Sequence, residues 1–430
     1  MRILVTGATG FIGRHILQAL VRQAGYETVA AVRSPRHLNQ LFPGIPALQM
    51  DASDCSVAQL SNALQGFDLV INAIGILNET ASQRFGELHV DFPCYLAQAC
   101  QQSGVRRLIH ISALGADDSA VSAYHQSKHA ADVFIRTLDM ESVIIKPSLV
   151  YGVGGTSSQL FAALSALPVQ TLVDHGAQRV QPVHIDDLAD AVLRLTNVSS
   201  SVPAELPAEL EVVGPAPMSF RDMLRTYRLW LGYGEVRVLS IPWPFVLCIA
   251  RLVRHTNRWL SEDNLQMLRQ GNTASASGLT QLLSRPPRAL EEALSPGAAT
   301  EAERWHARLY FLLPVLRLSV AFVWIFTGLV SLFLYPREDS YALLAQVGLT
   351  GNSAVIALYG AALLDIALGM ALLRRWQPLL VGVLQLMVIA GYTMVISVFL
   401  PEYWLHPYGP VTKNLPLLVA ILMLMAVDKR

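Results

Sequence analysis

The chain has 430 residues, a formal net charge of zero and only 15% charged residues. No basic run is present, so a nucleic-acid surface is not expected, and the four cysteines lack metal-ligand spacing, so no metal site is expected either. The length predicts two or three domains. Mean hydropathy is +0.40 over the whole chain, but this average combines two unlike parts. Residues 1–305 are typical of a soluble α/β protein, and residues 306–430 are mostly apolar.

The first predicted element is a short apolar strand, Ile3–Thr6, which leads directly into a glycine-rich turn and a helix. Glycines in this order allow a tight turn, a close approach of backbone amides to a pyrophosphate, and close packing of helix on strand. The helix N-terminus adds free N–H groups and the positive end of the helix dipole. The pattern predicts a dinucleotide site, with contacts expected from Gly7, Thr9, Gly10, Phe11, Ile12 and Gly13.

Apolar strands and amphipathic helices then alternate, which predicts a doubly wound parallel sheet covered on both faces, with its ligand at the carboxyl ends of the strands. Because a strand begins at Ile3, no signal peptide is expected and this part should stay in the cytosol. The predicted strands are Ile3–Thr6, Thr28–Val32, Ala47–Gln49, Leu69–Asn72, Arg107–Ile111, Ser142–Lys146 and Glu211–Val213, with helices at Gly13–Arg22, Val57–Leu64, Asp91–Ser103 and Tyr124–Leu138.

The end of the second strand discriminates between NAD and NADP. A carboxylate there binds the ribose 2′-hydroxyl of NAD, whereas arginine suits the 2′-phosphate of NADP. This chain has Arg33 and Arg36 and no carboxylate, which favours NADP(H); the alternative is a solvated basic loop. Asp51, after the third strand, is a candidate acceptor for the adenine amino group, or a cap for a helix over residues 53–60.

Small residues close the fourth strand at Ala73, Ile74 and Gly75. Backbone without bulky side chains suits a close passage beside a dinucleotide, and the alternative is an ordinary turn.

A second chemical signal is the pair Tyr124 and Lys128, which are four residues apart and therefore share a helix face. An ammonium beside the phenol is expected to favour the phenolate and make Tyr124 a usable acid and base at neutral pH. Lys128 is also expected to hydrogen-bond the nicotinamide ribose. Tyr and Lys at this spacing are common on solvated helices, so the pair by itself is weak evidence for a site. The support comes from its position, after the fifth strand and at the start of the next helix.

Together these segments resemble the short-chain dehydrogenase/reductase superfamily, in its extended or atypical form. The resemblance covers about the first 300 residues, and Ile111–Ala116 is similar to the branch that holds the NADPH-binding accessory subunit of respiratory complex I. It implies a Rossmann-type fold, glycine-loop contacts to the pyrophosphate and a Tyr/Lys pair at the ribose. The matching segments are Thr6–Gly13, Asn72–Gly75, His110–Ser112, Tyr124–Lys128, Lys146–Gly152 with Pro147 as a cofactor contact, and Val183–Ala189.

One position departs from the family pattern. Catalytic members carry Ser or Thr to polarise the substrate carbonyl, and the corresponding position here is Ala113. Ser112, one residue earlier, either substitutes for that group or only ties the strand end to a neighbouring backbone. In the second case turnover would lose a hydrogen-bond donor, while cofactor binding would be unaffected.

Residues 200–305 are expected to contribute much of a smaller substrate lobe. Within it, the apolar stretch Phe245–Val253 is too short to span a bilayer. It is edged by Arg251, Arg254 and Arg258, and two interpretations stay open: a core helix, or an amphipathic helix lying on the membrane.

The apolar part is predicted to be a four-helix membrane bundle. Arginines beside the first segment and between the second and third, with Lys429 and Arg430 at the end, predict cytosolic termini and a multi-pass protein of the inner membrane. Topology and the stretch Arg317–Gly328 resemble DoxX-like proteins, some of which are associated with quinone chemistry. The segments are Leu309–Tyr335, Ser353–Leu373, Pro378–Leu400 and Thr412–Val427.

Two ionisable residues lie inside these segments. Arg317 is near enough to a helix end to snorkel, whereas Asp365 is deeper. Asp365 is interpreted either as a proton or quinone-headgroup site or as a polar tie between helices.

The favoured function is a membrane-bound NADP(H)-dependent oxidoreductase for a lipophilic carbonyl, hydroxyl or quinone-like substrate. Tyr124 would be the acid and base, assisted by Lys128, with Ser112 as a doubtful third catalytic residue. The alternative is a non-catalytic NADPH-binding protein that assembles with, or senses redox state in, a membrane complex. A transporter with a regulatory nucleotide domain has only the bundle in its favour.

Overall fold

A computed structural model describes residues 1–197, 206–253 and 262–428. It divides into two compact units, unit 1 (Met1–Ala307) and unit 2 (Arg308–Arg430). Arg254, Arg258, Lys429 and Arg430, which entered the expectations above, lie outside the described residues.

Unit 1 is built on a seven-stranded sheet in the order β11-β6-β5-β4-β1-β2-β3, and every pairing in it is parallel. The order reverses between β1 and β4, which lie side by side. A crevice at the carboxyl ends of these two strands is where this fold binds ligands. The strands are β1 (Arg2–Thr6), β2 (Glu27–Val32), β3 (Ala47–Gln49), β4 (Leu69–Asn72), β5 (Arg107–Ile111), β6 (Glu141–Pro147) and β11 (Glu209–Val212).

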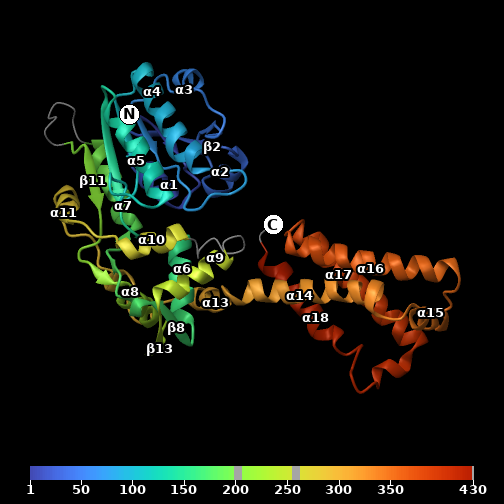
Figure 1. Cartoon of the computed structure of the whole chain (residues 1–430). Coiled ribbons are helices and arrows are strands. Elements are labelled where there is room, and N and C mark those ends of the chain that lie inside the picture. The colour runs from blue at the N-terminus through green and yellow to red at the C-terminus, as the bar shows by residue number, and fades with distance from the viewer. Residues whose placement is uncertain (198–205, 254–261, 429–430) are drawn as a thin grey trace. The chain divides into compact units, whose positions relative to one another are not determined.

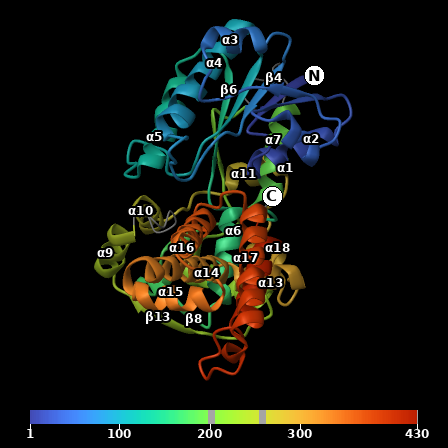
Figure 2. The ribbon, with the colours of Figure 1, turned by 90° about the vertical axis from the view of Figure 1, so that its right-hand side faces the viewer.

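Helices cover both faces of the sheet, as Figure 2 shows. The two faces bury separate apolar clusters, because alternate side chains of each strand point to opposite sides. One face is covered by α1 (Phe11–Val21), α2 (Pro35–Leu41), α7 (Ile185–Asn197) and α11 (Ser277–Leu283), and the other by α3 (Val57–Ala63), α4 (Phe92–Ser103) and α5 (Ala123–Arg136).

The predicted doubly wound sheet is confirmed, and all seven predicted strands are present with ends shifted by at most two residues. Helix α2 was not predicted; Ser34 starts it by accepting from the His37 amide, and Pro35 occupies its first position. A π-helical turn, Gly86–Asp91, also precedes α4.

A small lobe follows the sheet, and it buries an aromatic and aliphatic core of its own. It also holds the parallel pair β8–β13 (Figure 1). The stretch Trp243–Val253 forms helix α9, whose Val246 and Ala250 pack against Leu265 of α10 (Glu262–Gln270). The other elements of the lobe are α6 (Thr156–Ala166), β8 (Val169–Val173), α8 (Phe220–Trp230), β13 (Arg237–Ile241), α12 (Leu290–Ala293) and α13 (Glu301–Leu309). Short pairings β7 (Val150–Tyr151) with β10 (Val183–His184), and β9 (Arg179–Val180) with β12 (Met218–Ser219), complete unit 1.

Unit 2 is helical. Three of its apolar segments are long enough to cross a membrane: Leu312–Leu334, containing α14 (Leu312–Leu329), then α16 (Asn352–Leu373) and α17 (Pro378–Phe399). The fourth, α18 (Asn414–Val427), has 14 residues and is about 21 Å long, short of the ~30 Å hydrocarbon layer. The expectation of four spans is therefore met by length and composition in three helices. A short helix, α15 (Arg337–Gln346), connects α14 to α16.

The two ionisable residues inside these segments are both buried and both engaged. Arg317 on α14 pairs with Asp428, just after α18. Asp365 on α16 lies close enough to Tyr392 on α17 to interact with it. Both contacts link separate segments of unit 2.

Glycines hold α14 and α16 in close contact. A Cβ on Gly328 would lie 2.5 Å from the Ala362 carbonyl oxygen, and one on Gly369 would lie 2.6 Å from Ile325 and 3.0 Å from the Ala321 carbonyl oxygen. Small residues let helix backbones approach in this way, so that dispersion contacts stabilise their association in lipid.

A bulkier residue at this contact should separate the helices. Gly328→Leu is expected to lower the thermal midpoint of the detergent-solubilised protein, at a cost of about 1–3 kcal/mol from overpacking. Gly360→Leu on α16 is the matched control, because a Cβ there meets nothing within 4 Å. Equal midpoints for the two variants, measured by tryptophan fluorescence, would contradict the close contact.

Candidate functional site

The glycine loop lies at the carboxyl end of β1, beside the end of β4. Gly7 has φ of +68°, and a Cβ on it would lie 2.7 Å from the Ala73 carbonyl oxygen. The Gly10 amide donates to the Gly7 carbonyl at 2.9 Å, and a Cβ on Gly13 would lie 2.2 Å from that same carbonyl oxygen. Side chains at Gly7 and Gly13 are therefore excluded by backbone, as the sequence pattern predicts.

Helix α1 starts directly after this loop with Gly10 as its N-cap. No side chain caps its first turn, and that turn contains no acidic residue. The first amides of a helix have no partner within it, so this N-terminus is suited to an anion. Thr9, Phe11 and Ile12 are partly exposed around it.

The second strand ends as expected, with Arg33 and Arg36 exposed. Asp51 lies close enough to Arg33 to interact with it. Hydrogen bonds from the Ser53 hydroxyl (2.8 Å) and amide (3.1 Å) hold the pKa of Asp51 below its usual value, and the charge of Arg33 adds to that shift. The expected cap of a helix over residues 53–60 is wrong, because α3 begins at Val57 and is capped by Ser56, which accepts from the Gln59 amide.

The segment after β4 meets helix α5 at Lys128. The Lys128 Nζ donates to the carbonyls of Ile74 (3.2 Å) and Ile111 (3.0 Å). A Cβ on Gly75 would lie 3.3 Å from that Nζ. The ends of β4 and β5 and the ammonium are thereby brought together. Pro147, the other expected cofactor contact, is buried at the end of β6, where its carbonyl accepts from the Leu114 amide at 2.9 Å.

Tyr124 lies in the first turn of α5, which Ser122 caps by accepting from the His125 amide. Burial raises the pKa of Tyr124 to about 12, and the nearby Asp132 contributes in the same direction. The expectation that Lys128 makes the phenol more acidic is therefore not met in this structure. The physical reason is that Lys128 points its ammonium at two backbone carbonyls, while burial disfavours the phenolate.

Lys128 itself is 2% exposed. Burial lowers its pKa to about 8, and Asp132 opposes that shift. The lysine can therefore gain or lose a proton near neutral pH, which Tyr124 by itself cannot.

The sequence did not single out His89, a buried residue of the π-helical turn before α4. Its ring lies 5.4 Å from that of Tyr124, edge to face, and stacks on Phe85 at 5.0 Å. Nε2 accepts from the Ile76 amide (3.0 Å), and Nδ1 lies 3.0 Å from the Ser127 hydroxyl, which itself donates to the Tyr124 carbonyl. Nδ1 is therefore the donor, and burial, aided by Lys128, lowers the His89 pKa to about 2, so the ring is neutral.

Ser112 belongs to a buried network behind the site. Its hydroxyl donates to the Asp132 carboxylate at 2.6 Å, and both residues are buried. His110 Nε2 faces the other carboxylate oxygen at 3.6 Å, and His110 Nδ1 accepts from the Asn72 amide at 3.1 Å. The Asn72 orientation follows from Thr6, which donates to its side-chain oxygen at 2.7 Å. Of the two alternatives for Ser112, tying the strand end is the one seen here, although the partner is a carboxylate on α5 rather than backbone.

Comparison with known proteins agrees with this geometry. Residues 7–171 match the NAD(P)H-binding family, and residues 321–422 match the DoxX-like family. The chain joins an atypical short-chain dehydrogenase/reductase domain to a DoxX-like domain. The resemblances stated from sequence are thus confirmed, and the coarse cofactor class, NAD(P)H, is established for the first of these domains.

Two curated relatives each match part of this chain. Ceramide reductase of Caulobacter vibrioides is 26% identical over 267 residues, which cover 61% of this chain and 79% of the relative. Subunit 9 of the alpha subcomplex of mouse mitochondrial NADH dehydrogenase [ubiquinone] is 31% identical over 205 residues, 46% of this chain and 54% of that protein. The chain thus spans about half of the mitochondrial relative.

Among solved structures, an Escherichia coli NADPH-dependent quinone oxidoreductase complexed with NADPH superposes with a TM-score of 0.55. The two sequences are 18% identical, and the superposition covers 68% of this chain and 98% of the oxidoreductase chain. At this identity the superposition shows the shared fold.

The buried ammonium gives a pH prediction. Because the Lys128 pKa is about 8 when folded and 10.5 at its ordinary value, the unfolded chain binds more protons in that window and stability should rise with pH there. We expect the free energy of unfolding of the wild type to rise, relative to that of Lys128→Met, by on the order of 1.4 kcal/mol per pH unit in that window. Urea unfolding of both proteins at pH 7, 8, 9 and 10 measures the difference. Parallel stability curves would contradict a buried, titrating Lys128.

Proposed function

We propose that the protein is a membrane-held NADPH-dependent oxidoreductase acting on a lipophilic carbonyl, hydroxyl or quinone-like substrate. The observation that carries the proposal is the meeting of the Gly7–Gly13 loop, the Ala73–Gly75 segment and Lys128 at the β1/β4 crevice. The glycines there let the backbone turn tightly, so that the amides at the start of α1 can approach a diphosphate. One ammonium hydrogen of Lys128 remains after its two carbonyl contacts.

In this proposal the bound dinucleotide supplies the hydride. The α1 amides hold its diphosphate, and Arg33 and Arg36 hold the 2′-phosphate. Lys128 orients the ribose through its remaining N–H. Tyr124 gives or takes the substrate proton at its phenolic oxygen, and the neutral His89 ring supports the tyrosine ring from one side.

The name of one relative, a ceramide reductase, favours a lipid-like substrate, and the apolar helices of unit 2 would keep the protein at the bilayer from which such a substrate comes. We further propose that both termini are cytosolic and that the protein is multi-pass in the inner membrane. Arg304, Arg308, Arg374 and Arg375 lie on that side of the predicted spans.

A second candidate is a non-catalytic NADPH-binding protein of a membrane complex. It is favoured by Ser112, whose only hydroxyl hydrogen is directed to Asp132 and cannot also polarise a substrate carbonyl, and by Ala113 beside it. The mitochondrial NADH dehydrogenase relative supports an assembly role.

Tyr124→Phe separates the two candidates. For an enzyme it should lower kcat by at least about 100-fold, because the proton donor is lost, while NADPH binding changes little. NADPH oxidation is followed at 340 nm (a wavelength set by the reduced nicotinamide) with a short-chain ubiquinone and with membrane lipid extract. Tyr95→Phe, an exposed tyrosine of α4, is the control. A wild type that binds NADPH yet oxidises none with either substrate would favour the second candidate.

Cofactor preference is tested at the end of β2. Arg33→Ala should weaken NADPH binding about tenfold or more, since it removes a charge-assisted contact to the 2′-phosphate, and should leave NADH binding nearly unchanged. Calorimetric titration measures both affinities, with Arg22→Ala on the exposed end of α1 as control. Equal losses for the two dinucleotides would mean that Arg33 does not bind the 2′-phosphate.

A further inference from the structure

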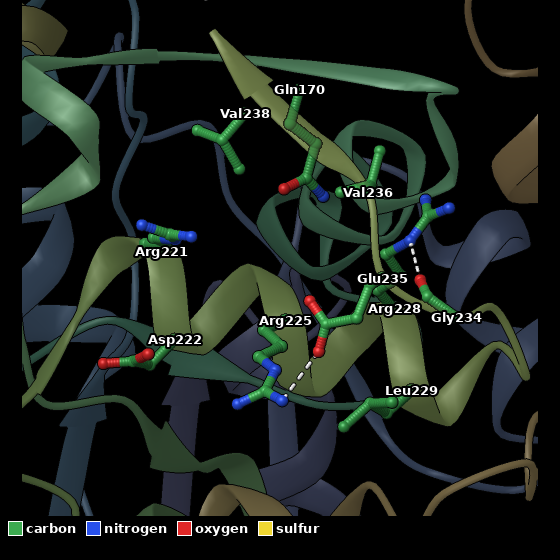
Figure 3. A pocket seen from close by; sticks show the side chains of 10 residues that line it. All are labelled: Gln170, Arg221, Asp222, Arg225, Arg228, Leu229, Gly234, Glu235, Val236 and Val238. Atoms are coloured by element: carbon green, nitrogen blue, oxygen red, sulfur yellow. Dashed lines mark hydrogen bonds and ion pairs between the residues drawn. The ribbon is translucent and has the colours of Figure 1, made fainter. Parts of the chain in front are cut away.

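The small lobe has a pocket between helix α8 and the pair β8–β13, shown in Figure 3. Three arginines from successive turns of α8 line it: Arg221, Arg225 and Arg228. Gln170 of β8 lies across from them, its amide pointing into the pocket. No lining residue belongs to the glycine loop, the strand ends or α5, so this pocket is separate from the dinucleotide site.

The three arginines differ in what they already bind. Arg228 is committed to the fold, since it donates to the carbonyls of Ser165 (2.7 Å), Leu167 (3.1 Å) and Gly234. It shapes the pocket and leaves ligand binding to the other two.

Arg225 and Arg221 are available. Arg225 pairs with Glu235 at 2.7 Å, but the two side chains are 61% and 78% exposed, and such a pair contributes little to stability. Within residues 1–197, 206–253 and 262–428, Arg221 has no ion pair or hydrogen bond from its guanidinium. An entering anion can therefore bind Arg221 and replace Glu235 at Arg225 at small cost.

Gln170 is the observation that points to a ligand. Its side chain is 4% exposed, and its amide nitrogen finds no acceptor among the residues that the structure describes. A buried donor without an acceptor is costly. An oxygen of a ligand in the pocket would satisfy it.

We propose that this pocket binds a phosphate group, either free or as the headgroup of a phospholipid. Guanidinium groups bind phosphate through paired N–H donors, and the Gln170 amide supplies a further donor from the opposite wall. Of the two lining acids, Asp222 already accepts from the Ser219 hydroxyl at 2.6 Å, and Glu235 is the exposed partner that the phosphate replaces. The proposal does not depend on the oxidoreductase function.

The test is a calorimetric titration of the full chain in detergent at constant ionic strength, with saturating NADPH so that the glycine loop is filled. The probes are inorganic phosphate and dioctanoyl phosphatidic acid, with dioctanoylglycerol as the phosphate-free lipid. Arg221→Gln and Gln170→Leu should each weaken phosphate binding about tenfold. Arg237→Gln, an exposed arginine of β13 that does not line the pocket, should change nothing.

Tighter binding of phosphatidic acid than of inorganic phosphate would support a lipid headgroup, and equal affinities would support a free phosphate. Absence of binding by both probes would overturn the proposal. So would binding that survives Arg221→Gln, or that Arg237→Gln weakens equally. Because Arg221 is exposed, its variant is expected to fold, so the result stands even where Gln170→Leu lowers the thermal midpoint.

Discussion

The close approach of two backbone segments at the ends of β1 and β4 underlies the whole site. Gly7 lies so near the Ala73 carbonyl that no side chain fits between them. This contact brings the glycine loop before α1 and the segment Ala73–Gly75 together at the carboxyl ends of β1 and β4. Lys128 then reaches the Ile74 carbonyl from α5. The sheet order matters because only at the reversal between β1 and β4 can two strand ends open in this way.

Behind the crevice, α5 buries a lysine and an aspartate one turn apart. Lys128 is 2% exposed and Asp132 is fully buried, and charges taken out of water are tolerated only with good partners. Two backbone carbonyls accept from Lys128, and Ser112 donates to one oxygen of Asp132, whose other oxygen faces His110 Nε2 at 3.6 Å. The arrangement ties α5 to the strand ends, and it commits the Ser112 hydroxyl to Asp132.

Sequence reasoning predicted the parts of the fold that have a strong periodic signal. The seven strands of the main sheet are apolar runs bounded by turns, and the glycine spacing is dictated by backbone contact, so both were readable. Two-residue pairings such as β9–β12 carry no such signal. Spacing placed Tyr124 and Lys128 on one face of a helix, but it carried no information on burial or on where the ammonium points. That is why the sequence predicted a lowered pKa for Tyr124, whereas burial raises it. His89 was missed because a lone histidine before a helix resembles any core residue.

The network from Thr6 through Asn72, His110 and Asp132 to Ser112 has a consequence for how the sequence can drift. Thr6 fixes the orientation of Asn72, Asn72 fixes the tautomer of His110, and Ser112 donates to Asp132. Exchanging one partner of such a pair for an apolar residue leaves a buried polar group on the other without its partner. Intermediates on a one-step-at-a-time route would be less stable than either end state. Across distant homologues these bonded positions should therefore change together or not at all, and an ancestor that lost the aspartate would be expected to have lost the serine with it.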